Sequence, residues 1–127
     1  MDRIWDPLRK KEVKLTPEEQ VRQWFISVLE EEMGVPRHMM MSEVAFKLGK
    51  KCFRADIIIY GKNLRPVAIV ECKRPEVSLS QEVIEQVVRY NMTMGVKYII
   101  ITNGNSTFIH GPEGFTAEAP KYENMIL

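Results

Sequence analysis

One segment in the middle of the chain constrains the fold more than any other. Residues 67–73 read VAIVECK, in which four apolar residues typical of a buried strand run without a break into Glu71 and Lys73. A second β-forming run, CFRADIIIY at 52–60, precedes it, and the intervening GKNLRP contains the Gly, Asn and Pro of a turn. The two runs are predicted to pair as an antiparallel hairpin, because a short turn can join antiparallel strands but not parallel ones.

The flanking segments predict helices and further strands around this hairpin. Thr16 is suited to cap a helix over 17–33, and Glu19 stands at the spacing of a capping box. A second helix is expected to follow Ser78 as its cap and to run to about Met94. Strands are predicted at 38–48, 96–102 and 106–110, with a weak one near 115–119.

The predicted elements follow the order α-β-β-β-α-β-β, which indicates an α/β fold with a mixed β-sheet flanked by helices. The helix between the third and fourth strands allows those two strands to align in parallel through a right-handed crossover. Residues 1–15 are charged and show no clear period, so they are expected to form an N-terminal arm. Residues 16–127 have the size of a single domain.

Composition narrows the classes of protein to consider. With 127 residues, 45% of them hydrophobic, and a net charge of +1, the chain has an ordinary globular composition and no overall basic field. No apolar run approaches the roughly 20 residues of a membrane span, and no signal segment is visible, so a cytoplasmic protein without membrane contact is expected. Cys52 and Cys72 are predicted to be reduced thiols, not a disulfide framework.

The register of the predicted hairpin follows from its loop. If 61–66 form the loop, residues whose numbers sum to 127 face each other: Tyr60 and Val67, Ile58 and Ile69, Asp56 and Glu71, Arg54 and Lys73. Directly opposite residues share one face of the sheet, with their Cβ atoms about 4.5–5.5 Å apart. A one-residue bulge would instead send Asp56 to the opposite face.

Two carboxylates held side by side repel each other, and a divalent cation between them would offset that repulsion. Hard oxygen ligands suit Mg²⁺, and Mn²⁺ is an expected substitute. Lys73 on the same edge could steady or deprotonate a water, or offset charge on a phosphate. The alternative from the residues is plain: Glu71 and Lys73 are the solvated end of a strand, with Asp56 paired to Arg54 or Lys73.

Four sequence elements stand in an order that resembles a known family: RADIIIY at 54–60, LRPVAIVECKRP at 64–75, the helical pair Gln86 and Tyr90, and YIIITNG at 98–104. In this order they are similar to the N-terminal nuclease domain of type I restriction enzyme R subunits, within the PD-(D/E)xK nuclease superfamily. The resemblance covers roughly residues 16–110. The family's usual Pro before the first Asp is replaced by Ala55.

The resemblance implies a restriction-endonuclease-like fold and Mg²⁺-dependent cleavage of DNA phosphodiester bonds. It implies that Asp56 and Glu71 ligate the metal together with the backbone carbonyl of Cys72. Lys73 would position or activate the attacking water. Gln86 matches an element that fixes the active-site lysine or the DNA backbone.

Further roles are expected for residues around this set. The first helix of such folds often adds an acid to the metal site, and Glu19 is the candidate, although a capping box explains Glu19 without any metal. DNA contacts are expected from four residues: Lys50, Lys51, Arg54 and Tyr90. DNA is the expected partner, with other restriction-modification subunits and a homodimer as further candidates.

Two other functions remain open at this point. The sequence contains no GxxxxGK[ST] motif, so it cannot be the ATP-driven translocase of a whole R subunit, and it is either an excised domain or a small stand-alone relative. The chain could therefore be a nuclease-fold module that binds DNA or protein and cleaves little by itself. It could also be a small oligomeric protein in which the carboxylate pair is structural.

Overall fold

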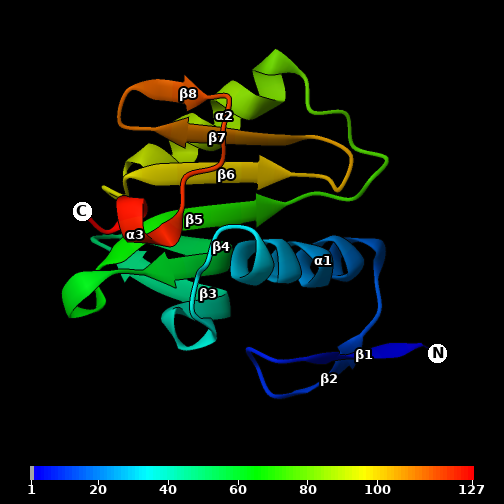
Figure 1. The fold of residues 1–127 in the computed structure, drawn as a ribbon. Helices are drawn as coiled ribbons and strands as arrows, with labels where there is room; N and C mark the ends of the chain where they lie inside the picture. The colour runs from blue at the N-terminus through cyan, green and yellow to red at the C-terminus, as the bar shows by residue number, and fades with distance from the viewer. Residues whose placement is uncertain (1) are drawn as a thin grey trace.

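The computed structural model describes residues 2–127, with every side chain in that range except those of Phe46 and Leu48. A six-stranded sheet with the spatial order β3-β4-β5-β6-β7-β8 forms its centre (Figure 1). The strands are β3 (Met40–Leu48), β4 (Lys51–Tyr60), β5 (Pro66–Cys72), β6 (Tyr98–Thr102), β7 (Thr107–Gly111) and β8 (Gly114–Thr116). The helices are α1 (Pro17–Glu31), α2 (Gln81–Met92) and the short α3 (Tyr122–Met125), with 3₁₀ turns at Arg37–Met39 and Lys62–Leu64.

Neighbouring strands of this sheet are antiparallel except β5 and β6, which are parallel and joined through α2. The predicted fold class is confirmed, and the predicted order α-β-β-β-α-β-β is found from α1 to β7, with two short strands before it and a short strand and helix after it. A parallel pair needs a long crossover, and α2 supplies it. No helix in residues 2–127 is both long enough and apolar enough to cross a membrane.

The two longer helices cover opposite faces of the sheet. The α1 face buries Ile57, Ile59 and Val70 against Phe25 and Leu29 of the helix. The other face buries residues of β6 against α2, in a cluster of Ile84, Val87, Val88, Ile99 and Ile101. The second half of β4, together with β5 and β6, reads as nearly continuous apolar runs because both faces of the sheet are covered there.

The N-terminal segment is a β-hairpin and not an extended arm. Strands β1 (Arg3–Asp6) and β2 (Lys11–Lys14) pair antiparallel as a separate two-stranded sheet beside α1 (Figure 1). The buried Asp6 carboxylate closes the turn by accepting the N–H of Leu8 at 2.8 Å and a side-chain hydrogen bond from Arg9. Strands of four residues carry too little periodicity to be recognised in the sequence.

Several predicted boundaries shift by a few residues. Helix α1 ends two residues before the expected position. The cap of α2 is Ser80, whose hydroxyl accepts the N–H of Val83 at 3.2 Å, so the prediction of Ser78 as the cap was wrong. The weak last strand exists, but it spans Gly114–Thr116 instead of 115–119.

The predicted register of the β4–β5 hairpin holds only in its centre. Ile58 pairs with Ile69, as the sum of 127 requires, and the neighbouring pairs follow the same rule. Tyr60 pairs with Pro66 and not with Val67. The 3₁₀ turn explains the shift, because Asn63 has a left-handed φ of 59° and tightens the loop.

Candidate active site

The paired strands β3 and β4 are both interrupted at one position, opposite the start of the candidate site. Ladder pairs exist on either side, but Glu43 has a left-handed φ of 54°, which is rare for a residue other than glycine. On β4, Ala55 and Ile58 belong to the same apolar cluster although they are three residues apart. The alternation of faces therefore slips by one residue at Asp56.

This slip decides where the Asp56 carboxylate lies. Its Oδ1 atom is 3.2 Å from Nη2 of Arg22 on α1, and its Oδ2 atom accepts the backbone N–H of Cys72 at 2.7 Å. The expected direct pairing of Asp56 with Glu71 on one face is not formed, and neither is that of Arg54 with Lys73. Asp56 thus lies on the face where a one-residue bulge would have placed it, although the β3–β4 pairs on either side of it keep the same register.

Burial raises the pKa of the Asp56 carboxyl above its ordinary value. The Cys72 N–H and the Arg22 guanidinium act in the opposite direction but do not cancel the effect, and the negative charge of Glu71 adds to the rise. Asp56 is thus a carboxylate for which the protein supplies less positive charge than its burial demands.

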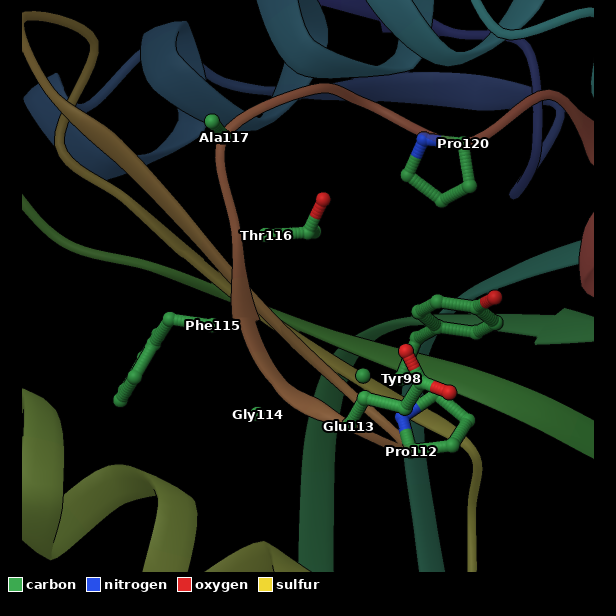
Figure 2. A pocket seen from close by; sticks show the side chains of 9 residues that line it. Tyr98, Pro112, Glu113, Gly114, Phe115, Thr116, Ala117 and Pro120 are labelled. Atoms are coloured by element: carbon green, nitrogen blue, oxygen red, sulfur yellow. The ribbon is translucent and has the colours of Figure 1, made fainter.

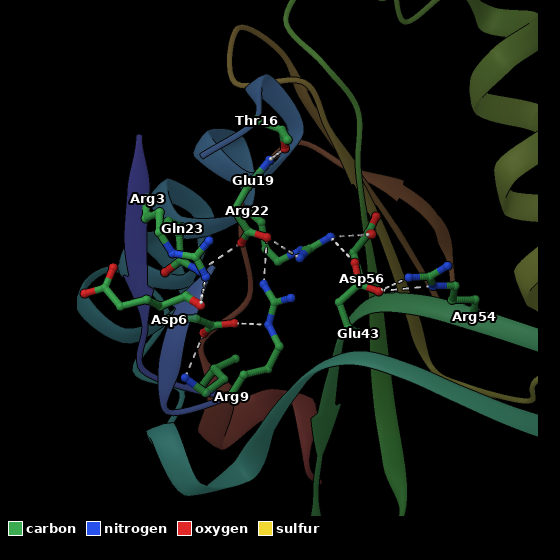
Figure 3. Close-up of polar contacts among 12 residues, drawn as sticks. Arg3, Asp6, Arg9, Thr16, Glu19, Arg22, Gln23, Glu43, Arg54 and Asp56 are labelled. Atoms are coloured by element: carbon green, nitrogen blue, oxygen red, sulfur yellow. Dashed lines mark hydrogen bonds and ion pairs between the residues drawn. The ribbon is translucent and has the colours of Figure 1, made fainter. Parts of the chain in front are cut away.

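Arg22 is the centre of a charged cluster on the α1 side (Figure 3). The side chain is only 5% exposed, and its guanidinium contacts Glu19 at 2.8 Å and Glu43 at 2.7 Å in addition to Asp56. The exposed Arg54 also binds Glu43. Burial acts to raise the pKa of the Glu43 carboxyl, but the guanidinium groups of Arg54 and Arg22 outweigh this effect and lower it. Three carboxylates therefore share one buried cation.

Glu19 lies in this cluster and also caps its own helix. Its N–H donates to Oγ1 of Thr16 at 3.0 Å, which is half of the predicted capping box. Its carboxylate turns away from Thr16 and accepts from Arg9, Arg22 and Gln23. A chain of alternating charges consequently runs from the N-terminal hairpin to the middle of β4 (Figure 3): Asp6, Arg9, Glu19, Arg22 and Asp56.

Glu71 belongs to the opposite side of the sheet. It stands between Val70 and Cys72, which both pack toward α1, so its side chain points toward α2. There it lines an open pocket of about 340 Å³ together with Lys73, Gln86 and Tyr90. The Lys73 Nζ atom lies 3.0 Å from Oε2 of Glu71. The predicted helical pair therefore reaches the same pocket as the Glu-Cys-Lys triplet.

A larger pocket of about 570 Å³ lies at the β7–β8 hairpin (Figure 2). Its lining includes Tyr98, Glu113, Phe115 and Pro120, and none of the predicted site residues. It offers a single carboxylate beside aromatic and proline rings, with no charged partner for it in the lining. The chemistry of the smaller pocket, and not its size, makes it the candidate site.

Comparisons with known proteins identify the family of the chain. Residues 17–117 match the model of the family described as type I restriction enzyme R protein N terminus. The chain belongs to this family. No functionally curated protein shows a significant match to the sequence.

Two solved structures share the fold of this R-protein N-terminal domain. One is a fragment of a candidate HsdR subunit of a type I restriction enzyme from Vibrio vulnificus YJ016, with a TM-score of 0.63 and 19% identity over 87% of the present chain. The chain spans 24% of that protein's length. The other is a candidate nuclease of the DUF820 group from Anabaena variabilis ATCC 29413, with a TM-score of 0.52, 13% identity, and coverage of 82% of this chain and 69% of that one.

Of the remaining predicted residues, Lys50, Lys51 and Arg54 lie outside the lining of the candidate site's pocket. Lys50 and Lys51 are exposed where β3 turns into β4. Arg54 is 75% exposed and bound to Glu43. Tyr90 lines the pocket, and its ring packs on Phe53 with 5.1 Å between the ring centroids. No group of three His, Cys, Asp or Glu side chains with metal-binding geometry occurs in the part of the chain that the structure describes.

Sequence reasoning missed Arg22 and Glu43. Arg22 stands four residues before Ile26 and seven before Leu29, which are both buried, so it occupies the apolar face of the helix. A guanidinium on such a face demands buried carboxylates, and this was a signal that the sequence offered. Glu43 gave no comparable signal, because its backbone conformation is not encoded in a pattern of apolar residues.

Proposed function

We propose that this R-protein N-terminal domain hydrolyses DNA phosphodiester bonds with a Mg²⁺ ion bound at the end of β5, beside Asp56 in the middle of β4, Mn²⁺ being able to substitute. One observation carries the proposal. Glu71 and Lys73 line a pocket with Gln86 and Tyr90, and the Cys72 N–H between them is bound to the carboxylate of Asp56. The ordered motif of the family thus converges on a single residue of β5.

The donor atoms are of the kind that Mg²⁺ takes, although the Asp56 side chain lies on the α1 face of the sheet and the Glu71 side chain on the α2 face. Asp56 and Glu71 offer carboxylate oxygens, and Mg²⁺ is usually bound through one or two carboxylates with the rest of its ligands supplied by water and substrate. The Cys72 N–H points toward β4. Because the N–H and C=O of one residue point to the same neighbouring strand in an antiparallel pair, we expect the Cys72 carbonyl to face the same space. Glu19 shares Arg22 with Asp56 and is a further candidate ligand.

The chain's own side chains then divide the work. A bound Mg²⁺ would supply Lewis-acid stabilisation of charge on the phosphate. When the Lys73 ammonium breaks its ion pair with Glu71, it holds the attacking water or offsets the charge of the phosphate. Gln86 orients Lys73 or the DNA backbone. Four residues would hold DNA phosphates: Lys50, Lys51, Arg54 and Tyr90.

The wider setting is proposed from the family. The Vibrio vulnificus protein is named as a subunit of a type I restriction enzyme, and we propose that the present domain likewise works with restriction-modification subunits. Because the proposed substrate is DNA, we also propose that the domain acts in the cytoplasm. A homodimer stays a prediction.

The test is nicking of supercoiled plasmid DNA in Mg²⁺ or Mn²⁺. We expect Asp56→Ala, Glu71→Ala and Lys73→Ala each to lower the rate by about 10²–10⁴-fold, the range lost with a catalytic acid–base or electrostatic group. Glu76→Ala is the matched control, because this exposed carboxylate near the end of β5 pairs with Arg74 outside the pocket. Nicking that survives all three changes in equally pure protein would refute the site.

A second function is favoured by the contact between Asp56 and Arg22, since a carboxylate already paired to a guanidinium needs a metal less. In that case the domain binds DNA or a partner protein and cleaves little alone. DNA binding would then weaken steeply with salt, without turnover in Mg²⁺ or Mn²⁺. Asp56→Ala would leave that binding intact.

A further inference from the structure

Arg22 lies where carboxylates from three different elements meet. Glu19 comes from α1, Glu43 from β3 and Asp56 from β4, and all three contact the same guanidinium (Figure 3). The Arg22 side chain is almost fully buried, and its Nε atom has no hydrogen-bond partner within the described residues. Burial of an arginine without full hydrogen bonding is costly, so its presence at this position calls for a physical reason.

The three contacts of Arg22 are unequal. The distances to Glu19 and Glu43 are 2.8 and 2.7 Å, whereas the distance to Asp56 Oδ1 is 3.2 Å. The other Asp56 oxygen is held separately by the Cys72 N–H. The Arg22–Asp56 contact can therefore break while Glu19 and Glu43 keep the guanidinium in place and Cys72 keeps Asp56 oriented.

A divalent cation bound to Asp56 would stand close to this guanidinium. The two positive charges repel each other in a partly buried site, where screening by water and salt is weak. Glu43 and Glu19 reduce that repulsion because they neutralise Arg22: Glu19 binds Nη1, and Glu43 binds Nη2, the nitrogen that also contacts Asp56. Exposed Arg54 also contacts Glu43, and Arg9 contacts Glu19, so each of these carboxylates is shared.

We propose that Arg22 is a positioning residue that sets the metal affinity of Asp56. It acts as a resident counter-charge which holds the carboxylate beside Cys72 and gives up only this one contact when a divalent cation binds. This inference rests on the proposed metal site. On this proposal Arg22 lowers the affinity of the site for a divalent cation, and Glu43 controls how readily Arg22 releases Asp56.

The experiment is calorimetric titration of the full chain with Mn²⁺, after circular dichroism has established that each variant is folded. Arg22→Gln is expected to bind Mn²⁺ at least about tenfold more tightly than the wild type, because the competing charge is gone. Arg37→Gln is the matched control, as it removes an exposed guanidinium that pairs with Glu30 outside the cluster, and its affinity should change by less than about twofold. Unchanged or weaker binding by folded Arg22→Gln would overturn the inference.

A variant of opposite sign guards against general effects of unfolding. Glu43→Gln leaves Arg22 with one neutralising carboxylate fewer, so Arg22 should hold Asp56 more firmly and Mn²⁺ should bind more weakly. In the double variant Arg22→Gln/Glu43→Gln this effect should disappear, because Arg22 transmits it. A Glu43→Gln effect of equal size in both backgrounds would mean simple loss of negative charge, and would contradict the role of Arg22.

A spectroscopic readout in the wild type applies even if Arg22→Gln fails to fold. The NMR signal of the Arg22 Nε–H should move during titration with Mg²⁺, with the same midpoint as the calorimetric binding. A signal that stays fixed while the site fills would overturn the inference.

Asp56→Asn separates the two levels of the argument. If this change leaves Mn²⁺ binding intact, or the wild type binds none, the proposed metal site fails and the role of Arg22 falls with it. If Asp56→Asn abolishes binding while Arg22→Gln does not tighten it, the inference about Arg22 fails alone and the proposed function stands.

Discussion

The two sides of the end of β5 hold their charges in different ways. On the α1 side, Asp56 belongs to a buried chain of ion pairs that reaches back to the N-terminal hairpin. On the α2 side, Glu71 and Lys73 lie in an open pocket, and the ion pair found between its lining residues is the one they make with each other. One side fixes its carboxylate in advance, and the other leaves its side chains free to meet a substrate.

The difference suggests how a site can be both ordered and accessible. A carboxylate held by a backbone N–H and a buried guanidinium needs little reorganisation when a ligand arrives. A half-exposed lysine can exchange partners without disturbing the core. Substitutions of the ion-pair partners on the α1 side should therefore change stability, and substitutions on the α2 side should change activity, with the proposed metal ligand Asp56 affecting both.

The largest effect on stability is expected from Arg22→Gln. Removing this guanidinium leaves three carboxylates without their shared cation, and breaking a buried ion pair in this way typically costs about 3–5 kcal/mol. Urea denaturation measures the change in the free energy of unfolding. Arg54→Gln, at an exposed position, should leave the urea midpoint unmoved. Equal losses in the two variants would remove the contrast between the buried and exposed guanidinium groups.

The next effect concerns Asp6, at the far end of the same ion-pair chain. Burial acts to raise the pKa of the Asp6 carboxyl, but hydrogen bonds from Arg9 and from the Leu8 N–H outweigh it and lower the pKa below 3.8. A lowered folded pKa contributes stability that is present above the unfolded value and is lost as pH falls through the folded one. Asp6→Asn should therefore cost about 1–3 kcal/mol at neutral pH.

The measurement for Asp6 is urea denaturation of wild type and variant at neutral pH and at a pH well below 3.8. The difference between the two proteins should shrink as the pH falls. A difference that is constant with pH would show that the hairpin is held by packing and not by the Asp6 charge.

On the α2 side, Gln86→Ala should lower DNA nicking by about tenfold to a hundredfold, since a misplaced catalytic group costs that much. The free energy of unfolding should stay within about 0.5 kcal/mol, because Gln86 is an exposed helix residue. Glu85→Ala is the control, since the Glu85 side chain, next to Gln86 in the sequence, accepts a hydrogen bond from Gln81 and does not line the pocket. Loss of stability in Gln86→Ala without loss of nicking would reverse the predicted division.

The smallest effect on stability is expected for the pair of Lys73 and Glu71. Both side chains are partly exposed, and such ion pairs contribute about 0–1 kcal/mol. A double-mutant cycle with Lys73→Met and Glu71→Gln should give a coupling in that range, which added salt weakens further. A coupling above about 2 kcal/mol would mean that this side is as preorganised as the other.

Much of the fold could be predicted from periodicity and turn residues, because these are local. The strands around Ile58 and Ile69 and the helix after Thr16 follow from apolar spacing and capping. The register of the hairpin came from counting its loop, and it held where the strands are regular. It failed at Tyr60 because Asn63 and Leu64 adopt left-handed conformations that shorten the loop.

The arrangement of the site could be predicted less well, because it depends on contacts between distant segments. Nothing near Asp56 in the sequence reveals that Glu43, on another strand, has a positive φ and shifts the faces of the sheet. The pocket shared by Glu71, Lys73 and Gln86 followed from the resemblance. The position of the buried Arg22 guanidinium beside Asp56 did not follow from the resemblance.

The two cysteines differ in burial, so their rates of chemical modification can report local unfolding of the domain. Cys52 is exposed, whereas Cys72 is buried, and burial together with the charge of Asp56 raises the pKa of its thiol well above the ordinary value. Since the thiolate is the reactive species, an alkylating reagent should modify Cys52 rapidly and Cys72 only when β5 unfolds locally. The rate of the slow reaction would report how often the strand that carries Glu71 and Lys73 leaves its neighbours.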